Sequence, residues 1–303
     1  MKIIKQPGEY SYVYSKYLEP IAKVMPGEVF AVQTKDAFEN RITDESDLPA
    51  EVLGDYVNPQ TGPIFVEGAE PGDTLIVDII DIQPTRDYAI SAIIKDFGGL
   101  TRTETTRMLN KPLPERIWKY NIKDGFVTHN ENLSFPWRPF LGTIGTSPDL
   151  EAVSALVPSK HGGNMDVPDV KPGNSIHLPV KVEGGYFYIG DCHAGQGDGE
   201  LCGGALEIPA ETKLKFTLKK NESIEWPRIE SPTELMVVGS AKPMEDAARI
   251  AYAELVKWLI ELGWDEMEAY QALTQIGQLY VGNMVNPSYS LVAKIDKKYA
   301  LTK

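Results

Sequence analysis

Short apolar or alternating segments, separated by turn residues, fill most of the first 240 positions of the chain. Three of these segments directly follow a Pro-Gly pair and occupy residues 28–34, 73–82 and 174–182. Proline presets the first central residue of a type II turn and glycine accepts the positive φ of the second, so each pair is expected to start a strand. Further strands are predicted at residues 186–190, 213–219 and 234–239.

From Met244 the spacing of apolar residues changes to that of a helix. One apolar stripe precedes Gly263, which is expected to end the helix, and consists of Ala248, Ala251, Leu255, Trp258, Leu259 and Leu262. A second helix is expected to start at Asp265, because Glu268 three positions later resembles a capping box. Its stripe is Ala269, Leu273, Ile276 and Tyr280, so the pattern predicts a helical hairpin over residues 243–281.

Strands followed by helices indicate a β-rich α+β protein, most simply a β-sandwich or a distorted barrel with a late helical hairpin packed on it. The chain of 303 residues is long enough for a substantial core. No linker is long or polar enough to force a division. Residues 1–303 are therefore expected to form one domain, β-rich over 1–240, with the hairpin 243–281 packed against that part.

The composition narrows the possible partners. The formal net charge of -13 disfavours electrostatic capture of nucleic acid or of an anionic membrane, and no apolar run is long enough to span a bilayer. The first residues lack the apolar core and cleavage site of a signal peptide, so a cytoplasmic location is expected. Two cysteines are too few for a disulfide framework or for a structural zinc cluster.

The most informative stretch is GDCHAGQGDGELCGGALE, residues 190–207, which interleaves polar and acidic residues with glycines. Its candidate functional residues are Asp191, His193, Gln196, Asp198, Glu200 and Glu207. In an extended segment Asp191 and His193 point to the same side, and one imidazole with carboxylates suits zinc or a harder divalent ion. The alternative is an acidic, glycine-rich surface loop, against which the density of ligand types argues.

This run resembles the signature of the acetamidase/formamidase family. Residues 58–79 and the segment HGGNMDV (161–167) resemble further blocks of that family, so the resemblance extends from roughly residue 20 to the late helices. It implies a β-rich amidase fold, a bound divalent metal, and hydrolysis of formamide or acetamide to the acid and ammonia. It also implies a homodimer or larger assembly. The expected partner is a small neutral amide.

The resemblance also implies roles for individual residues. Asp36, Asp191 and His193 are expected as metal ligands, with His161 and Glu207 as further candidates. Zinc is the most strongly expected metal, and calcium is an alternative at the same or a neighbouring site.

The expected reaction is metal-assisted hydrolysis, in which the ion lowers the pKa of water and polarises the amide carbonyl. Glu200 is the first candidate for the general acid/base that passes a proton to the leaving amine, and Asp198 is the alternative. Asn164 is expected to donate a hydrogen bond to the substrate carbonyl.

Other interpretations remain open at this stage. A calcium-stabilised β-sandwich that binds sugar without catalysis would explain the carboxylates but not the histidine among them. A hydrolase of cyclic imides, lactams or esters would use the same activated water. A cysteine amidase would use Cys192 as its nucleophile, but Cys192 and His193 are neighbours in a strand and should point to opposite faces, so a small buried role is expected for the cysteine.

Two more segments have alternative interpretations. Residues 134–148 (SFPWRPFLGTIGTSP) are expected either to form a wall of the substrate pocket or to be an ordinary packed loop. His177, in the predicted strand 174–182, is expected to be a structural histidine rather than a ligand.

Overall fold

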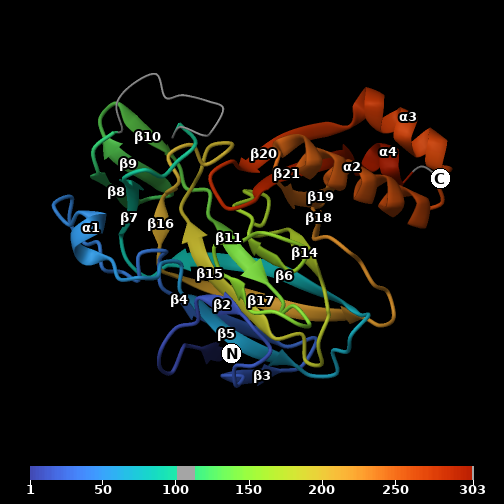
Figure 1. The fold of residues 1–303 in the computed structure, drawn as a ribbon, viewed down its shortest axis with the longest axis horizontal. Coiled ribbons are helices and arrows are strands. Elements are labelled where there is room, and N and C mark those ends of the chain that lie inside the picture. Colours follow the sequence, from blue (N-terminus) through green and yellow to red (C-terminus); the bar gives the residue numbers. More distant parts are fainter. Residues whose placement is uncertain (101–112, 302–303) are drawn as a thin grey trace.

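Two large β-sheets share one hydrophobic core in the computed structural model, which describes residues 1–100 and 113–301 (Figure 1). Across the described residues both sheets are open rather than closed into a barrel. Phe187 of one sheet packs edge-on against Phe216 of the other, with ring centroids 4.9 Å apart. This arrangement confirms the expected β-rich α+β class.

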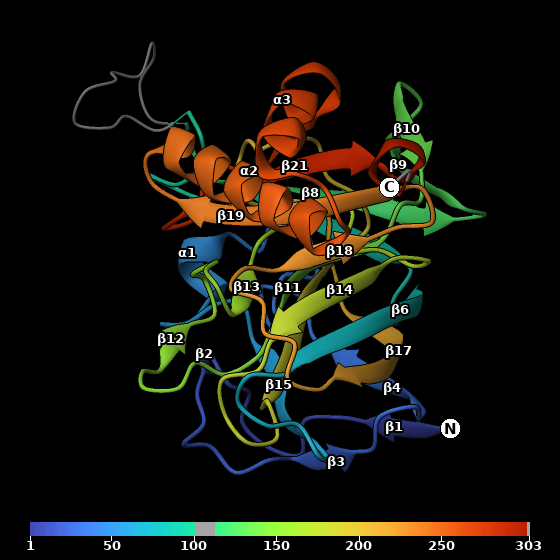
Figure 2. The same cartoon turned by 90° about the vertical axis from the view of Figure 1, so that its right-hand side faces the viewer.

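The first sheet has nine strands, most of which follow one another in a visible ladder (Figure 2). Their order is β1 (Lys2–Ile4), β4 (Val29–Thr34), β17 (Ala210–Lys219), β6 (Thr74–Pro84), β14 (Ser175–Pro179), β18 (Arg228–Glu230), β19 (Glu234–Ala241), β21 (Tyr289–Asp296) and β20 (Gln278–Asn283). The longest pairing, between β6 and β17, runs over the whole length of β17.

The second sheet contains Asp191, His193 and Glu207 of the informative stretch 190–207. Its main path is β10 (Leu133–Pro136), β9 (Phe126–Asn130), β8 (Arg116–Lys123), β7 (Tyr88–Ile93), β16 (Glu207–Ile208), β15 (Phe187–His193), β11 (Phe140–Gly145) and β13 (Gly162–Asn164). Off this path, β5 (Gln60–Val66) pairs with β15 and with β3 (Ala22–Val24), and a small separate sheet joins β2 (Val13–Tyr14) to β12 (Val153–Ser154). Strand β15 therefore lies in the interior of its sheet.

The three Pro-Gly turns form as expected. Gly27, Gly72 and Gly173 have φ of 90°, 98° and 89°, which only glycine adopts without strain. A backbone hydrogen bond of 3.1 to 3.2 Å closes each turn, and β4, β6 and β14 follow directly. The local turn chemistry thus sets where the main strands of the first sheet begin.

The helical hairpin packs on the far end of the first sheet. Helix α2 (Met244–Glu261) lies against β19 and β21, and α3 (Glu266–Ile276) returns beside it (Figure 2). The side chain of Asp265 caps α3 by accepting the backbone N–H groups of Met267 and Glu268. Two short helices, α1 (Pro49–Val52) and α4 (Lys297–Ala300), complete the described structure, and no described helix is long and apolar enough to cross a lipid bilayer.

One boundary of the hairpin prediction was wrong. Helix α3 ends at Ile276, and Tyr280, which continues the helical spacing, lies in strand β20. The backbone becomes extended at Gly277, and residues 278–283 pair with β21 instead. Two strands therefore follow the helices and extend the first sheet, and the backbone groups of residues 278–283 find their partners along β21.

Candidate active site

A buried group of ionisable side chains gathers where β15 lies beside β16. Asp191 and His193 come from β15, and Glu207 lies opposite His193 on β16. The Nε2 atom of His193 is 3.1 Å from Asp191 Oδ1 and 3.3 Å from Glu207 Oε2. Asp191 and His193 thus share one face, as their spacing predicted, and all three side chains are almost completely withdrawn from solvent.

Two further carboxylates reach this group from loops. Asp166 follows β13, and Glu200 comes from the glycine-rich segment between β15 and β16. One ligand atom each of Asp166, Asp191 and His193 lie within 4.8 Å of one another, and the same holds for His193, Glu200 and Glu207. We call these five residues the acidic cluster; His193 belongs to both sets of three.

Backbone conformation also marks the cluster. Asp166, Asp191 and Glu200 have φ of 49°, 52° and 50°, in the left-handed region that residues with side chains adopt infrequently. Such conformations cost on the order of 1 kcal/mol each and persist only where the surroundings impose them. The surroundings here hold three carboxylates toward one point.

The orientation of His193 is fixed by Gln196. The amide nitrogen of Gln196 donates to the carbonyl oxygens of Asp166 and Gly282, both at 2.9 Å, so its oxygen is left to face His193 Nδ1 at 3.1 Å. Because this oxygen can only accept, Nδ1 must carry the proton. In the neutral ring the lone pair is then on Nε2, which points at the carboxylates, and this is the arrangement of a metal-binding histidine.

Polar neighbours orient the carboxylates as well. Thr143 donates to Asp191 Oδ2 at 2.9 Å, and Asn286 donates to Asp166 Oδ2 at 2.7 Å. The amide of Asn164 satisfies its neighbours when its nitrogen, rather than its oxygen, faces the carboxylates. In this orientation the nitrogen donates to Asp191 Oδ2 at 2.7 Å and to Asp166 Oδ1 at 3.1 Å. The carboxylates are therefore held by neutral donors that leave their charge uncompensated.

Strand β11 approaches the cluster so closely that no side chain fits at Gly142. A Cβ atom at this position would lie 2.6 Å from Asp166 Oδ1 and 2.9 Å from Asp191 Oδ2. Real contacts of this kind do not occur below 3.0 Å, so glycine is required there. The distance between these two carboxylates depends on the absence of this one methyl group.

With all four carboxyl groups ionised, the cluster would carry more negative charge than one imidazole can neutralise. Burial, to which neighbouring carboxylates add, raises the pKa of Glu200 and of Glu207 to about 8, and raises the pKa of Asp166 well above its usual range. Burial would lower the pKa of His193, but Glu207 and Asp191 raise it well above its ordinary value. Three of the four carboxyl groups therefore tend to hold protons near neutral pH, and a divalent cation bound here would take the place of those protons.

A second observation fits a cation. Glu207 Oε2 is buried and makes no hydrogen bond with any described residue, although it lies only 3.3 Å from His193 Nε2. A buried carboxylate oxygen without a donor costs free energy unless it binds a cation. The ligand types at this point, one imidazole nitrogen and several carboxylate oxygens, are those of zinc sites.

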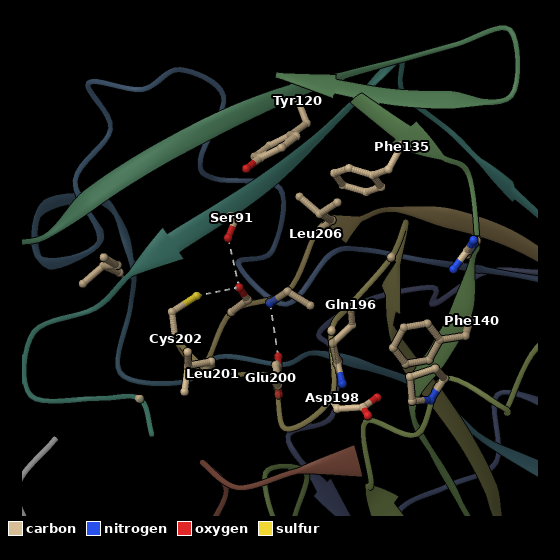
Figure 3. A pocket seen from close by; sticks show the side chains of 18 of the residues that line it. Ser91, Tyr120, Phe135, Phe140, Gln196, Asp198, Glu200, Leu201, Cys202 and Leu206 are labelled. Atoms are coloured by element: carbon tan, nitrogen blue, oxygen red, sulfur yellow. Dashed lines mark hydrogen bonds between the residues drawn. The ribbon is translucent and has the colours of Figure 1, made fainter. Parts of the chain in front are cut away.

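A cavity of about 1100 Å³ leads from the surface to this cluster. Glu200 and Gln196 line its inner end together with Asp198, and Tyr120, Phe135 and Leu206 line its apolar side (Figure 3). Of the acidic cluster only Glu200 is among the described residues that line the cavity. A molecule bound in the cavity would meet the cluster at the Glu200 carboxylate.

The structure brings together some of the residues expected from the sequence and separates others. Asp191, His193, Glu200 and Glu207 belong to the cluster, and Asn164 binds two of its carboxylates. Asp198 is exposed and lines the cavity near Glu200.

Asp36 and His161 lie outside the cluster. The carboxylate of Asp36 is paired with Arg86 at 2.7 Å and accepts two backbone N–H groups, from Phe38 and Asn40. His161 packs edge-on against the ring of Tyr14, with centroids 4.7 Å apart. Neither side chain belongs to a group that could hold a metal among the described residues.

Two other expectations can be compared with the structure. Cys192 is fully buried on the opposite face of β15, where its thiol lies 3.5 Å from Thr34 Oγ1, and burial raises the pKa of this thiol to about 11. The expected burial of Cys192 is confirmed. From the segment 134–148, Phe135, Pro136 and Phe140 line the cavity, so part of it forms a wall of the pocket.

The sequence analysis missed Asp166 and the donors Thr143 and Asn286, and it gave Gln196 no role. Asp166 lies within the segment HGGNMDV, which resembles a family block, and a carboxylate three residues after a pair of glycines was the available signal. No pattern in the sequence pointed to Asn286, because it is 120 positions away from Asp166, the cluster residue that it contacts.

Comparison with known proteins gives a consistent result. A family model described as the Acetamidase/Formamidase family matches residues 5–156 and 150–286. An acetamidase structure from Yersinia enterocolitica is 41% identical, with a TM-score of 0.93 over 99% of this chain and 94% of that one. An acetamidase structure from Bacillus halodurans is 32% identical, with a TM-score of 0.90 over 98% of each chain.

A curated formamidase from Methylophilus methylotrophus is 28% identical over 273 residues. This match covers 72% of the present chain and 66% of that formamidase. The chain thus matches slightly less than two thirds of the length of this curated relative.

Proposed function

The chain belongs to the acetamidase/formamidase family, and on that basis we propose that it hydrolyses carboxamides to the carboxylic acid and ammonia at the acidic cluster. The observation that carries this proposal is the orientation of His193, whose Nε2 faces Asp191 and Glu207 while Nδ1 is committed to Gln196. An imidazole held in this way among uncompensated carboxylates supports a metal-dependent hydrolase rather than a purely structural polar core.

Asp191, His193 and Glu207 are the proposed ligands of a divalent metal ion, with Asp166 beside them. The imidazole favours zinc over calcium, because calcium prefers oxygen ligands. When bound, such an ion polarises a carbonyl group and lowers the pKa of water, which supplies a nucleophile at neutral pH.

Glu200 is the proposed general acid/base, because it alone joins the cluster to the cavity. Its carboxylate accepts a proton from the attacking water as the new C–O bond forms at the amide carbon. It then gives that proton to the amide nitrogen as the C–N bond breaks, which releases ammonia and the acid. Burial keeps the pKa of Glu200 high, at about 8, which suits an acid/base near neutral pH.

Asn164 has a supporting role in this proposal. Its amide nitrogen is engaged by Asp191 and Asp166, so it holds these carboxylates in place rather than polarising the substrate carbonyl. Asp36 and His161 are left out of the ligand set because of their positions away from the cluster.

The first test is ammonia release from formamide and acetamide by purified protein, before and after exhaustive chelation and after zinc, manganese or calcium is restored. We expect activity to vanish on chelation and to return best with zinc. Activity that persists in protein shown by elemental analysis to be free of metal would remove the metal from the proposal. Absence of ammonia release from every amide by metal-loaded protein would reject amide hydrolysis.

A matched pair of variants tests the acid/base. Glu200→Gln is expected to lower kcat by 10²- to 10⁴-fold, the usual contribution of general acid/base catalysis. Asp198→Asn, two residues away in the same cavity but exposed, is expected to lower kcat less than tenfold. A larger loss in Asp198→Asn than in Glu200→Gln would exchange the two assignments.

The family resemblance also supports a homodimer as the proposed assembly. Size-exclusion chromatography with light scattering, at micromolar protein concentration, measures the mass of the assembly directly. A mass near the 33.6 kDa of a single chain would reject the dimer.

A further inference from the structure

The cavity at the acidic cluster is far larger than formamide or acetamide requires. Its volume of about 1100 Å³ slightly exceeds the range of roughly 300–1,000 Å³ that is usual for small-molecule pockets. We propose that this chain prefers a carboxamide whose acyl part is a large apolar group, such as a medium-length alkyl chain or an arylalkyl group. This inference rests on the proposed amide hydrolysis and specifies its substrate.

The cavity has one polar end and one apolar side. Glu200, Gln196 and Asp198 gather at the polar end, next to the acidic cluster (Figure 3). Tyr120 and Phe135 stand away from it, on strands β8 and β10. A carboxamide that reaches Glu200 therefore has its acyl group directed along apolar side chains, and this polarity matches a molecule with an amide at one end only.

The apolar side is built from residues at the margin of the main core. Tyr120 and Phe135 pack against the margin of the main core and remain half-buried, with their ring centroids 6.3 Å apart. Leu206 is nearly buried beside them, and Phe97 and Leu201 stay exposed around the same cavity. Large apolar side chains gathered at a cavity next to a reactive group are typical of a ligand site.

The size of the expected preference follows from the transfer of apolar groups out of water. Each methylene buried contributes about 0.8 kcal/mol, which corresponds to about a fourfold increase in kcat/KM where the contact is kept in the transition state. Hexanamide has a longer chain than acetamide by several methylenes, so its kcat/KM is expected to be on the order of 100-fold higher.

The test is a series of amides with the metal-loaded protein: acetamide, butanamide, hexanamide and phenylacetamide. We expect kcat/KM to rise along the alkyl series, and phenylacetamide to be hydrolysed with a kcat/KM at least as high as that of butanamide. Hydrolysis of acetamide with a kcat/KM equal to or above that of hexanamide would overturn the preference while leaving amide hydrolysis intact. No hydrolysis of any amide would overturn the proposed function and this inference together.

Competitive inhibition provides a second measurement, which does not depend on the hydrolysis of a long-chain amide. Hexan-1-ol carries the apolar chain without an amide, and it is expected to inhibit acetamide hydrolysis with an inhibition constant on the order of 100-fold below that of ethanol. Equal inhibition constants for the two alcohols would show that the cavity does not bind the chain.

A matched pair of variants locates the binding surface. Phe135→Ala removes an aromatic ring from the cavity, and it is expected to reduce the ratio of kcat/KM for hexanamide to that for acetamide by about tenfold. Phe126→Ala removes the same side chain from the neighbouring strand β9, where it is half exposed and outside the cavity, and this ratio should stay at its original value. An equal change in both variants would remove the cavity as the source of the preference.

Discussion

His193 and His161 are both withdrawn from solvent, with 0% and 5% of their surface exposed, yet their surroundings shift their pKa in opposite directions. Burial alone acts on His161 and lowers its pKa to about 4. At His193 the charges of Glu207 and Asp191 outweigh burial, and the pKa is raised. A buried histidine therefore keeps its proton where neighbouring carboxylates outweigh burial, and a metal ion at Nε2 of His193 would have to replace that proton.

The strongest way to break this comparison is to substitute each histidine in turn. His193→Gln is expected to lose bound zinc and to lower kcat/KM at least about 1,000-fold, because it removes the proposed nitrogen ligand. His161→Gln is expected to retain zinc and most of the activity. Elemental analysis and ammonia release measure both properties. Loss of zinc from His161→Gln in folded protein would make His161 a ligand after all.

The orientation of His193 can be tested through Gln196. Gln196→Leu removes the acceptor that holds the Nδ1 proton, and the affinity for zinc is expected to fall about 10- to 100-fold, as for other residues that orient metal ligands. Competition with a chromophoric chelator gives this affinity.

Gln60→Leu serves as the control for loss of a buried amide. Gln60 is completely buried, whereas Gln196 is only partly buried, and the amide of Gln60 bonds to Asn58 instead of to His193. Its variant is expected to lose stability while keeping its zinc affinity. A fall in zinc affinity as large as that of Gln196→Leu would deny Gln196 a specific role.

The lowered pKa of His161 predicts how the free energy of unfolding depends on pH. The folded-state pKa of His161, about 4, is below the unfolded value of about 6.5, so the unfolded chain takes up the proton first as the pH falls. The free energy of unfolding is then highest above pH 6.5 and decreases toward pH 4, by about 3 kcal/mol for this residue.

Urea denaturation at pH 7, 6 and 5 measures that slope. In His161→Gln the decrease is expected to be smaller, and the remainder includes His177, whose pKa burial also lowers to about 4. An unchanged dependence on pH in the variant would show that His161 is not neutral in the folded state.

The smallest expected effect concerns Cys192, the sequence neighbour of His193 on the opposite face of β15. Cys192→Ala should change kcat/KM less than about threefold and cost about 1 kcal/mol in unfolding free energy, since it removes one buried sulfur atom. Thermal unfolding and ammonia release check both values. Complete loss of activity in a stable variant would instead support a cysteine nucleophile.

The sequence predicts elements well where a local signal exists. Each Pro-Gly pair determined a turn and a following strand, and the stripe from Met244 determined α2, because these signals act within a few residues. Tyr280 was assigned to a helix because its spacing from Ile276 fits a helical turn. The pairing of residues 278–283 with β21 decided otherwise, and such long-range pairing leaves no local trace.

The candidate site was predictable to a similar degree. The pair Asp191 and His193 and the later Glu207 stand in one short run, so their convergence could be expected from spacing. Asp36 also looked suitable by its residue type, but the structure pairs it with Arg86, and no spacing rule relates residues this far apart. The donors that orient the cluster, Thr143 and Asn286, are common polar residues whose role depends on position in space alone.

Gly142 limits the space beside the acidic cluster, although it is not a member of the cluster. The backbone of β11 lies directly against Asp166 and Asp191 at Gly142, although β11 contributes no member of the cluster. A methyl group added there would force one or both of these carboxylates to move. The space that the cluster occupies thus depends on a residue without a side chain, which itself offers no ligand atom.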